Sequence, residues 1–136
     1  MTERQSTAQG MISGMTPVLQ SGEFAFATLP DGADAALLGS AIATFHEAEG
    51  LSVILPMAEA DTAGLPCDTP MACITLNVYS ALEGVGLTAA VATALAEAGI
   101  ACNMVAAFHH DHAFVPAGEG ERAIALLKDL SASIRT

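Results

Sequence analysis

The residues best suited to chemistry form one short run in the last third of the 136-residue chain, His109-His110-Asp111-His112. Imidazole and carboxylate groups are common ligands of zinc and similar ions. In an extended strand, however, His110 and His112 share one face while Asp111 points to the other. Two ligands from one strand are too few for a closed metal site, and no H-E-x-x-H spacing recruits His46 as a third. We therefore expect the imidazoles to contact an anionic ligand or to make local hydrogen bonds, with metal binding by His110 and His112 as the alternative.

A second chemically suggestive stretch is the loop Ser80-Ala81-Leu82-Glu83-Gly84-Val85-Gly86. Glycines let backbone amides approach an anion, and they also let a chain turn sharply from a strand into a helix. The stretch lacks the third glycine of a dinucleotide fingerprint and the Lys-Ser/Thr of a P-loop. The loop is therefore a candidate binding loop without a nucleotide signature.

No catalytic residue is assigned. Ser80, Asp111 and the histidines contain the groups of a nucleophilic triad, but no G-x-S-x-G elbow surrounds Ser80. The sequence leans against an enzyme and implies no cofactor. A metal-dependent enzyme that uses the His109–His112 run stays open as the alternative, as does a purely structural interaction module.

The three cysteines, Cys67, Cys73 and Cys102, are odd in number and have no CxxC spacing. This pattern argues against a disulfide framework or a zinc knuckle and indicates reduced thiols. The N-terminal residues do not have the basic and apolar regions of a secretory signal, and no stretch is a continuous apolar span of membrane length. We expect a cytoplasmic protein.

The charge of the chain is strongly negative, with 15 acidic residues against four Lys and Arg and a formal net charge of −11. A phosphate backbone or an anionic lipid surface requires clustered cations. We therefore expect no nucleic-acid partner and no membrane partner. A hydrophobic content of 52% excludes a disordered chain.

The spacing of apolar residues in the first half of the chain predicts a strand, a helix and a second strand. Residues 1–15 are a flexible lead-in without periodicity, and Phe24 and Phe26 alternate with alanines as in a half-buried strand. Apolar positions at helical spacing predict an amphipathic helix over 35–49 that ends before Gly50; they are Leu38, Ala41, Ile42 and Phe45. A strand over 51–55 and a short helix over 57–63 follow.

A turn-rich stretch at residues 67–70 divides the chain into two halves, 16–66 and 67–136. The second half predicts a strand at 74–79, a helix at 87–98, a strand at 100–108, a hairpin turn at 109–111, a strand at 112–115 and a helix at 119–133. This alternation predicts an α+β fold of the ferredoxin-like kind, repeated in tandem, with antiparallel sheets covered on one face by helices.

Three runs carry a resemblance to a known family: residues 47–55, residues 74–90, and residues 99–116, which end in His110-Asp111-His112-Ala113-Phe114-Val115-Pro116. Over nearly everything from Pro17 onward, the chain resembles a family of short bacterial ACT-domain-containing proteins of uncharacterised function. The resemblance implies two ACT-like halves and a regulatory role in binding an amino acid or another small effector, and it implies no reaction.

In ACT domains the effector sits near the loop that joins the first strand to the first helix. The resemblance places that loop at Tyr79 to Leu87 of this chain, and we add Asn103 and two histidines of the hairpin as further contacts. The expected ligand-binding residues are Tyr79, Ser80, Leu82, Glu83, Gly84, Val85, Gly86, Leu87, Asn103, His110 and His112. Because small sheets leave open edge strands that another copy commonly covers, we also expect a homodimer.

Overall fold

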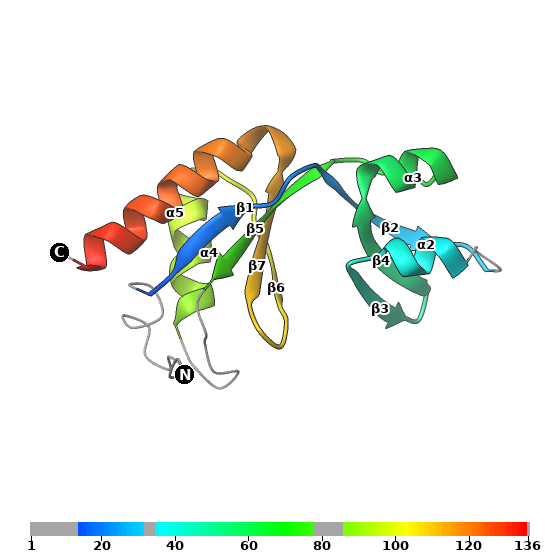
Figure 1. The fold of residues 1–136 in the computed structure, drawn as a ribbon, viewed down its shortest axis with the longest axis horizontal. Coiled ribbons are helices and arrows are strands. Elements are labelled where there is room, and N and C mark those ends of the chain that lie inside the picture. Colours follow the sequence, from blue (N-terminus) through cyan, green and yellow to red (C-terminus); the bar gives the residue numbers. More distant parts are fainter. Residues whose placement is uncertain (1–13, 32–34, 78–85, 136) are drawn as a thin grey trace. The chain divides into compact units, whose positions relative to one another are not determined.

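The structure is a computed structural model that describes residues 14–31, 35–77 and 86–135. The described chain forms two compact units (Figure 1). One, here called the terminal unit, combines residues 14–20 with residues 73–135. The other, the inserted unit, is Ser21–Ala72. The chain therefore leaves the terminal unit after Gln20 and re-enters it at Cys73.

The terminal unit is a sheet with helices on one face (Figure 1). The strands lie in the order β1-β5-β7-β6, and β1 and β6 are antiparallel to their partners β5 and β7. This is the ferredoxin-like order, with the N-terminal strand in the edge position beside β5. The elements are β1 (Thr16–Leu19), β5 (Met71–Asn77), α4 (Leu87–Glu97), β6 (Asn103–Ala106), β7 (Asp111–Pro116), the 3-10 turn η1 (Ala117–Glu119) and α5 (Gly120–Arg135).

The core of the terminal unit lies between its sheet and its helices. Alternate residues of β5 point to opposite faces, and Leu76 shares a face with the buried Pro17 of β1, the strand on which α5 packs. The hydroxyl of Ser131 in α5 donates a hydrogen bond to the Met15 carbonyl (2.9 Å) and fixes this packing. The fully buried side chains of this core include Met15, Ile74, Leu76, Val91, Leu95, Ala113, Val115, Ala123 and Leu127. Thr75, between Ile74 and Leu76, therefore points to the face without helices.

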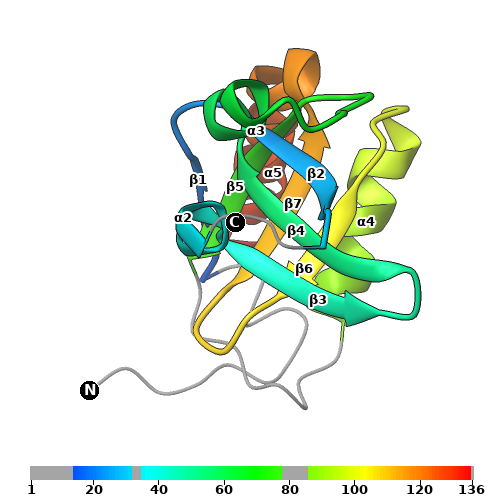
Figure 2. The ribbon, with the colours of Figure 1, turned by 90° about the vertical axis from the view of Figure 1, so that its right-hand side faces the viewer.

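The inserted unit is a smaller version of the same plan. Its strands lie in the order β3-β4-β2, seen side by side in Figure 2, and Phe24 at the start of β2 pairs with Met71 at the start of β5. Leu37 of α2 and Ala60 of α3 pack on the same core as Ala25, Val53 and Leu55. The elements are β2 (Phe24–Leu29), α2 (Ala35–Ser40), β3 (Ala43–Glu47), β4 (Gly50–Pro56) and α3 (Met57–Ala63).

The helix predicted over 35–49 is wrong in its second half. Helix α2 ends at Ser40, and residues 43–47 form β3, antiparallel to β4. Pairing with β4 satisfies the backbone of β3, and its β-branched and aromatic residues suit a strand. Gly50 has φ of +146° and belongs to the β3–β4 hairpin rather than to a helix end. The apolar spacing was misleading because Leu38, Ile42 and Phe45 are all exposed, whereas Leu37 enters the core.

Other predicted elements are confirmed. Helix α3 covers the expected residues and ends at Gly64, whose φ of +70° is left-handed, and helices α4 and α5 lie where expected. The strand expected over 100–108 is shorter, at Asn103–Ala106. The fold class, two ACT-like ferredoxin-type units with antiparallel sheets, is confirmed.

Strand β1 was not predicted. Because it pairs with β5, residues 16–19 belong in space to the terminal unit, although they precede the inserted unit along the chain. The division into 1–15, 16–66 and 67–136 stays a prediction about the order along the chain. In the described ranges, no helix has the length and apolar character needed to cross a bilayer.

Candidate functional site

Most of the expected binding loop lies outside the described residues. Six of the predicted ligand-binding residues lie outside the described residues: Tyr79, Ser80, Leu82, Glu83, Gly84 and Val85. The described candidates are the residues at the start of α4 and those of the β6–β7 hairpin. Figure 1 shows that α4 starts at the same end of the terminal unit as the tip of this hairpin, where β5 also ends.

Gly86 is the residue that starts α4. Its φ of +104° is left-handed, which explains why glycine stands there, and its carbonyl accepts the first helical bond from the Ala90 amide (2.9 Å). Leu87 is only 3% exposed, so its side chain belongs to the core and its backbone is what a ligand could meet. No side chain of the described residues caps the first turn. The first N–H groups of α4 are therefore suited to an anionic acceptor.

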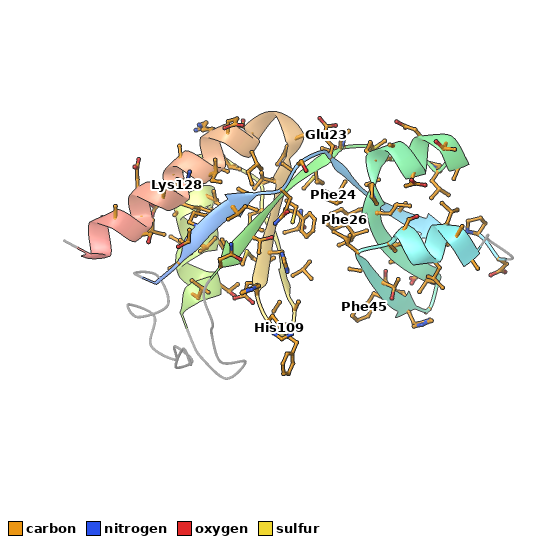
Figure 3. The ribbon with its side chains drawn as sticks, viewed as in Figure 1. Glu23, Phe24, Phe26, Phe45, His109 and Lys128 are labelled. Carbon is orange, nitrogen blue, oxygen red and sulfur yellow. The ribbon has the colours of Figure 1, made fainter. Side chains whose placement is uncertain are left out.

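His110 lies at the hairpin, just before β7. The Ala107 amide donates to the His110 carbonyl (3.0 Å) and closes the turn. Its ring stands beside that of His109, which in turn meets Phe108 edge-on, with 5.0 Å between the ring centroids. Figure 3 labels His109 at the tip of the hairpin. The Nδ1 atom of His110 is buried and has no hydrogen-bond partner in the described part of the chain, an arrangement that favours a bound water or a ligand atom.

His112, two residues along β7, is held by a buried hydroxyl. Its Nδ1 lies 3.0 Å from Oγ1 of Thr75, and the same oxygen accepts a hydrogen bond from Nε2 of Gln20 (2.8 Å). Thr75 is 6% exposed. This three-residue chain joins the residue after β1 to β5 and β7 on the sheet face without helices. Sequence reasoning missed both Thr75, the partner of His112, and Gln20, the partner of Thr75, because β1 was not predicted and Thr75 is one of several polar residues that alternate along a strand.

Asn103 is exposed and opens β6 opposite Phe114. Because Val105, two residues on, is opposite His112, Asn103 and His112 are on the same face of the sheet, one diagonal step apart. His110 lies at the other end of the hairpin from Asn103. The predicted site residues thus divide into two places: the helix start and His110 at one end, and Asn103 with His112 on the open face.

The electrostatics of the hairpin favour a neutral imidazole. Burial lowers the pKa of His112 from its ordinary value, and the neighbouring His110 lowers it further, while Asp111 acts in the opposite direction. Burial raises the pKa of Asp111, against the effect of His112 and His110. Near neutral pH the imidazole of His112 is therefore uncharged, and it acts as a hydrogen-bonding group rather than as a cation.

Two of the cysteines, Cys73 and Cys102, are unsuited to nucleophilic chemistry. All three are free thiols. Burial raises the pKa of Cys73 to about 11, only partly offset by a hydrogen bond with Thr75, and burial also raises the pKa of Cys102. Because the thiolate is the reactive form, these two cysteines are inert near neutral pH.

A metal site lacks ligands in this geometry. Across residues 14–31, 35–77 and 86–135, no three His, Cys, Asp or Glu side chains are grouped so that they could hold an ion. The alternative through His110 and His112 thus finds no third ligand in those ranges.

Comparison with known families identifies the class of protein that this fold defines. Two ACT domain models match, one over residues 8–72 and the other over residues 68–129. The chain therefore belongs to the ACT domain family, as a tandem of two such domains, and the resemblance seen in the sequence is confirmed.

Among solved structures, the chain is similar to a Vibrio cholerae protein of unknown function, named as a possible transport protein. The identity is 40% and the TM-score 0.79, over 90% of this chain and 94% of the other. An Agobacterium tumefaciens protein shares the fold at 20% identity and a TM-score of 0.71, over 86% and 89% of the two chains. So does the regulatory subunit of aspartate kinase from Thermus thermophilus, at 12% identity and 0.54, over 86% and 98%. No curated protein matches the chain.

Proposed function

We propose that this protein is a regulatory module whose terminal unit binds a small organic acid or an amino acid. The observation that carries the proposal is the buried Nδ1 of His110, which has no partner in the described ranges and belongs to the hairpin at the end where α4 begins. Membership of the ACT domain family supports a ligand-binding role. The shared fold of an aspartate kinase regulatory subunit supports a regulatory one.

The ligand's carboxylate would be held by backbone N–H groups at Gly86 and Leu87. The helix dipole favours negative charge at this position, which offsets the repulsion from a chain of net charge −11. His110 would contribute a polar contact at the same end, and His112 and Asn103 would contact a part of the ligand that extends along the open face of the hairpin. Such a ligand regulates by binding one conformation better than another, with no bond made or broken.

Two other functions make different predictions. A metal-dependent enzyme that uses His110 and His112 requires stoichiometric metal that is lost when both are changed to alanine. A purely structural interaction module requires that no metabolite stabilises the protein. The lack of a third metal ligand among the described residues disfavours the first, and the unpartnered His110 nitrogen disfavours the second.

The proposal extends to a cytoplasmic homodimer. Free cysteines fit a reducing compartment. Strand β3 is the last strand in the order of the inserted unit, and its Phe45 side chain is 72% exposed. Phe24 and Phe26 of β2 project from the same side of this unit (Figure 3). An open strand edge beside an apolar face suits pairing with a second copy.

A thermal-shift screen over amino acids, small organic acids and divalent metals tests the function. A ligand held at one hundred times its dissociation constant should raise the stability by about 2.7 kcal/mol. We expect an acid to stabilise the wild-type chain and His46→Ala, but not His110→Ala. His46 is the matched control because it is an exposed histidine of the inserted unit. Stabilisation by a metal alone, or by nothing, would overturn the proposal.

A further inference from the structure

The buried hydroxyl of Thr75 is a branching point for hydrogen bonds. Its oxygen lies 2.8 Å from Nε2 of Gln20 and 3.0 Å from Nδ1 of His112, and it also bonds to the thiol of Cys73 on the same face of β5. A hydroxyl has one proton to donate and two lone pairs that accept. The acceptor of its single proton therefore follows from what each of the three neighbouring groups can donate or accept.

Gln20 is a donor, because its side-chain nitrogen can only donate, and it occupies one lone pair of the Thr75 oxygen. The hydroxyl proton of Thr75 then has two acceptors within reach, the sulfur of Cys73 and Nδ1 of His112. Sulfur accepts a hydrogen bond only weakly, whereas the bare nitrogen of a neutral imidazole is a full acceptor. The hydroxyl therefore donates to Nδ1 of His112.

We infer that Gln20 and Thr75 are positioning residues that fix His112 as the tautomer protonated at Nε2, so that the ring presents a hydrogen-bond donor to an acceptor group of the ligand. This inference rests on the proposed function for the ligand and on the hydrogen bonds for the tautomer. It narrows the ligand class: the atom beside His112 is a carboxylate or carbonyl oxygen, and an ammonium group does not fit there.

The same contacts connect the His112 ring to the two positions where the chain passes from one unit to the other. Gln20 is the last residue before the inserted unit and Cys73 the first after it. The backbone amide of Gln20 also donates to the Cys73 carbonyl (2.9 Å). A ligand that engages His112 therefore acts on a network anchored at the two points where the chain leaves and re-enters the terminal unit.

The tautomer is measured directly by long-range proton–nitrogen correlation of the imidazoles in the uniformly nitrogen-15-labelled, full-length wild-type chain near pH 7.5. We expect His112 to show an unprotonated Nδ1 and a protonated Nε2. In Thr75→Val the population should shift toward a mixture of tautomers, and Thr75→Ser should keep the wild-type pattern. A wild-type His112 protonated at Nδ1 overturns the inference, whether or not either variant folds.

A second experiment, which measures binding affinity, separates this inference from the proposed function. For the acid that stabilises the wild-type chain most in the screen, Thr75→Val should weaken binding about tenfold and Thr75→Ser less than about threefold. If His112 carries its proton at Nε2 but no acid binds, the proposed function fails and the tautomer assignment stands. If an acid binds while His112 is protonated at Nδ1, the inference fails and the proposed function stands.

Discussion

Oγ1 of Thr75 lies 3.0 Å from Nδ1 of His112, which links the centre of β5 to the start of β7 through a buried side chain. Both residues point to the sheet face without helices, where a hydroxyl among apolar neighbours is costly unless it is bonded. Here it has one partner on the neighbouring strand β7 and one in the residue after β1. The contact therefore serves both the stability of the terminal unit and the orientation of a candidate ligand group.

Replacing Thr75 by valine removes this hydroxyl without changing the shape of the side chain. The polar atoms of Gln20 and His112 then lose a partner, and we expect the free energy of unfolding to fall by about 1–3 kcal/mol. Thr75→Ser keeps the hydroxyl and should lose less. Urea denaturation followed by circular dichroism measures the difference. A valine variant as stable as wild type would show that the hydrogen bonds contribute nothing net.

The core of the terminal unit gives a second prediction, about packing. Leu127 of α5 is fully buried, so Leu127→Ala should lower the free energy of unfolding by about 2–5 kcal/mol through lost transfer energy and a cavity. Leu38→Ala, at an exposed position outside the proposed dimer contact, should change it by about 0.5 kcal/mol or less. Denaturant titration of both variants tests the assignment. Equal losses would mean that Leu38 is as buried in solution as Leu127.

The pH dependence of stability follows from the lowered pKa of His112. Between its lowered value in the folded chain and 6.5, the unfolded chain binds a proton that the folded chain does not. Stability therefore rises with pH across this window and is lost as the pH falls through it. His112→Gln should flatten that slope in a series of melting temperatures. An unchanged slope would assign the effect to another group.

Asp111 acts with the opposite sign in a lower window. Its pKa is raised in the folded chain, so between 3.8 and the raised value the folded state keeps a proton that the unfolded state has lost. Its contribution to stability therefore decreases as the pH rises through that window. Asp111→Asn removes this decrease, and the same melting series measures it. A variant in which the same decrease persists would contradict the assignment.

Self-association is tested at β3. Phe45→Lys places a charge on the exposed edge strand and should shift the protein toward monomer, whereas Leu38→Lys, at an exposed position on α2 of the same unit, should not. Light scattering coupled to size-exclusion chromatography reports the mass. A wild-type monomer at every concentration, or a dimer unaffected by Phe45→Lys, would rule out β3 as the dimer contact.

Particular residues show what the sequence could and could not predict. Helix α4 was identified because its apolar positions are the ones that are buried, including Val91 and Leu95. The 35–49 helix was wrong because Leu38, Ile42 and Phe45 imitate a helical face while being exposed, and long-range pairing with β4 decided the structure. Strand β1 was missed because four residues carry little periodicity, and its partner is more than fifty residues away.

The candidate site was predictable to a similar extent. The hairpin histidines and the glycine at the start of α4 stood out by residue type. Gln20 and Thr75 did not, because their role comes from pairing between β1, β5 and β7 that local patterns do not encode. Residue type thus indicates a site when its groups are chemically distinctive, and only topology reveals the residues that orient them.

The central claim is that a small acid binds to the terminal unit beside the hairpin. Isothermal titration of the acid selected by the thermal screen into wild type, His110→Ala and His46→Ala tests it most directly. We predict saturable binding with equal affinity for wild type and His46→Ala, and binding at least about tenfold weaker for His110→Ala. Equal affinity for all three proteins, or no saturable binding to wild type, would contradict the claim.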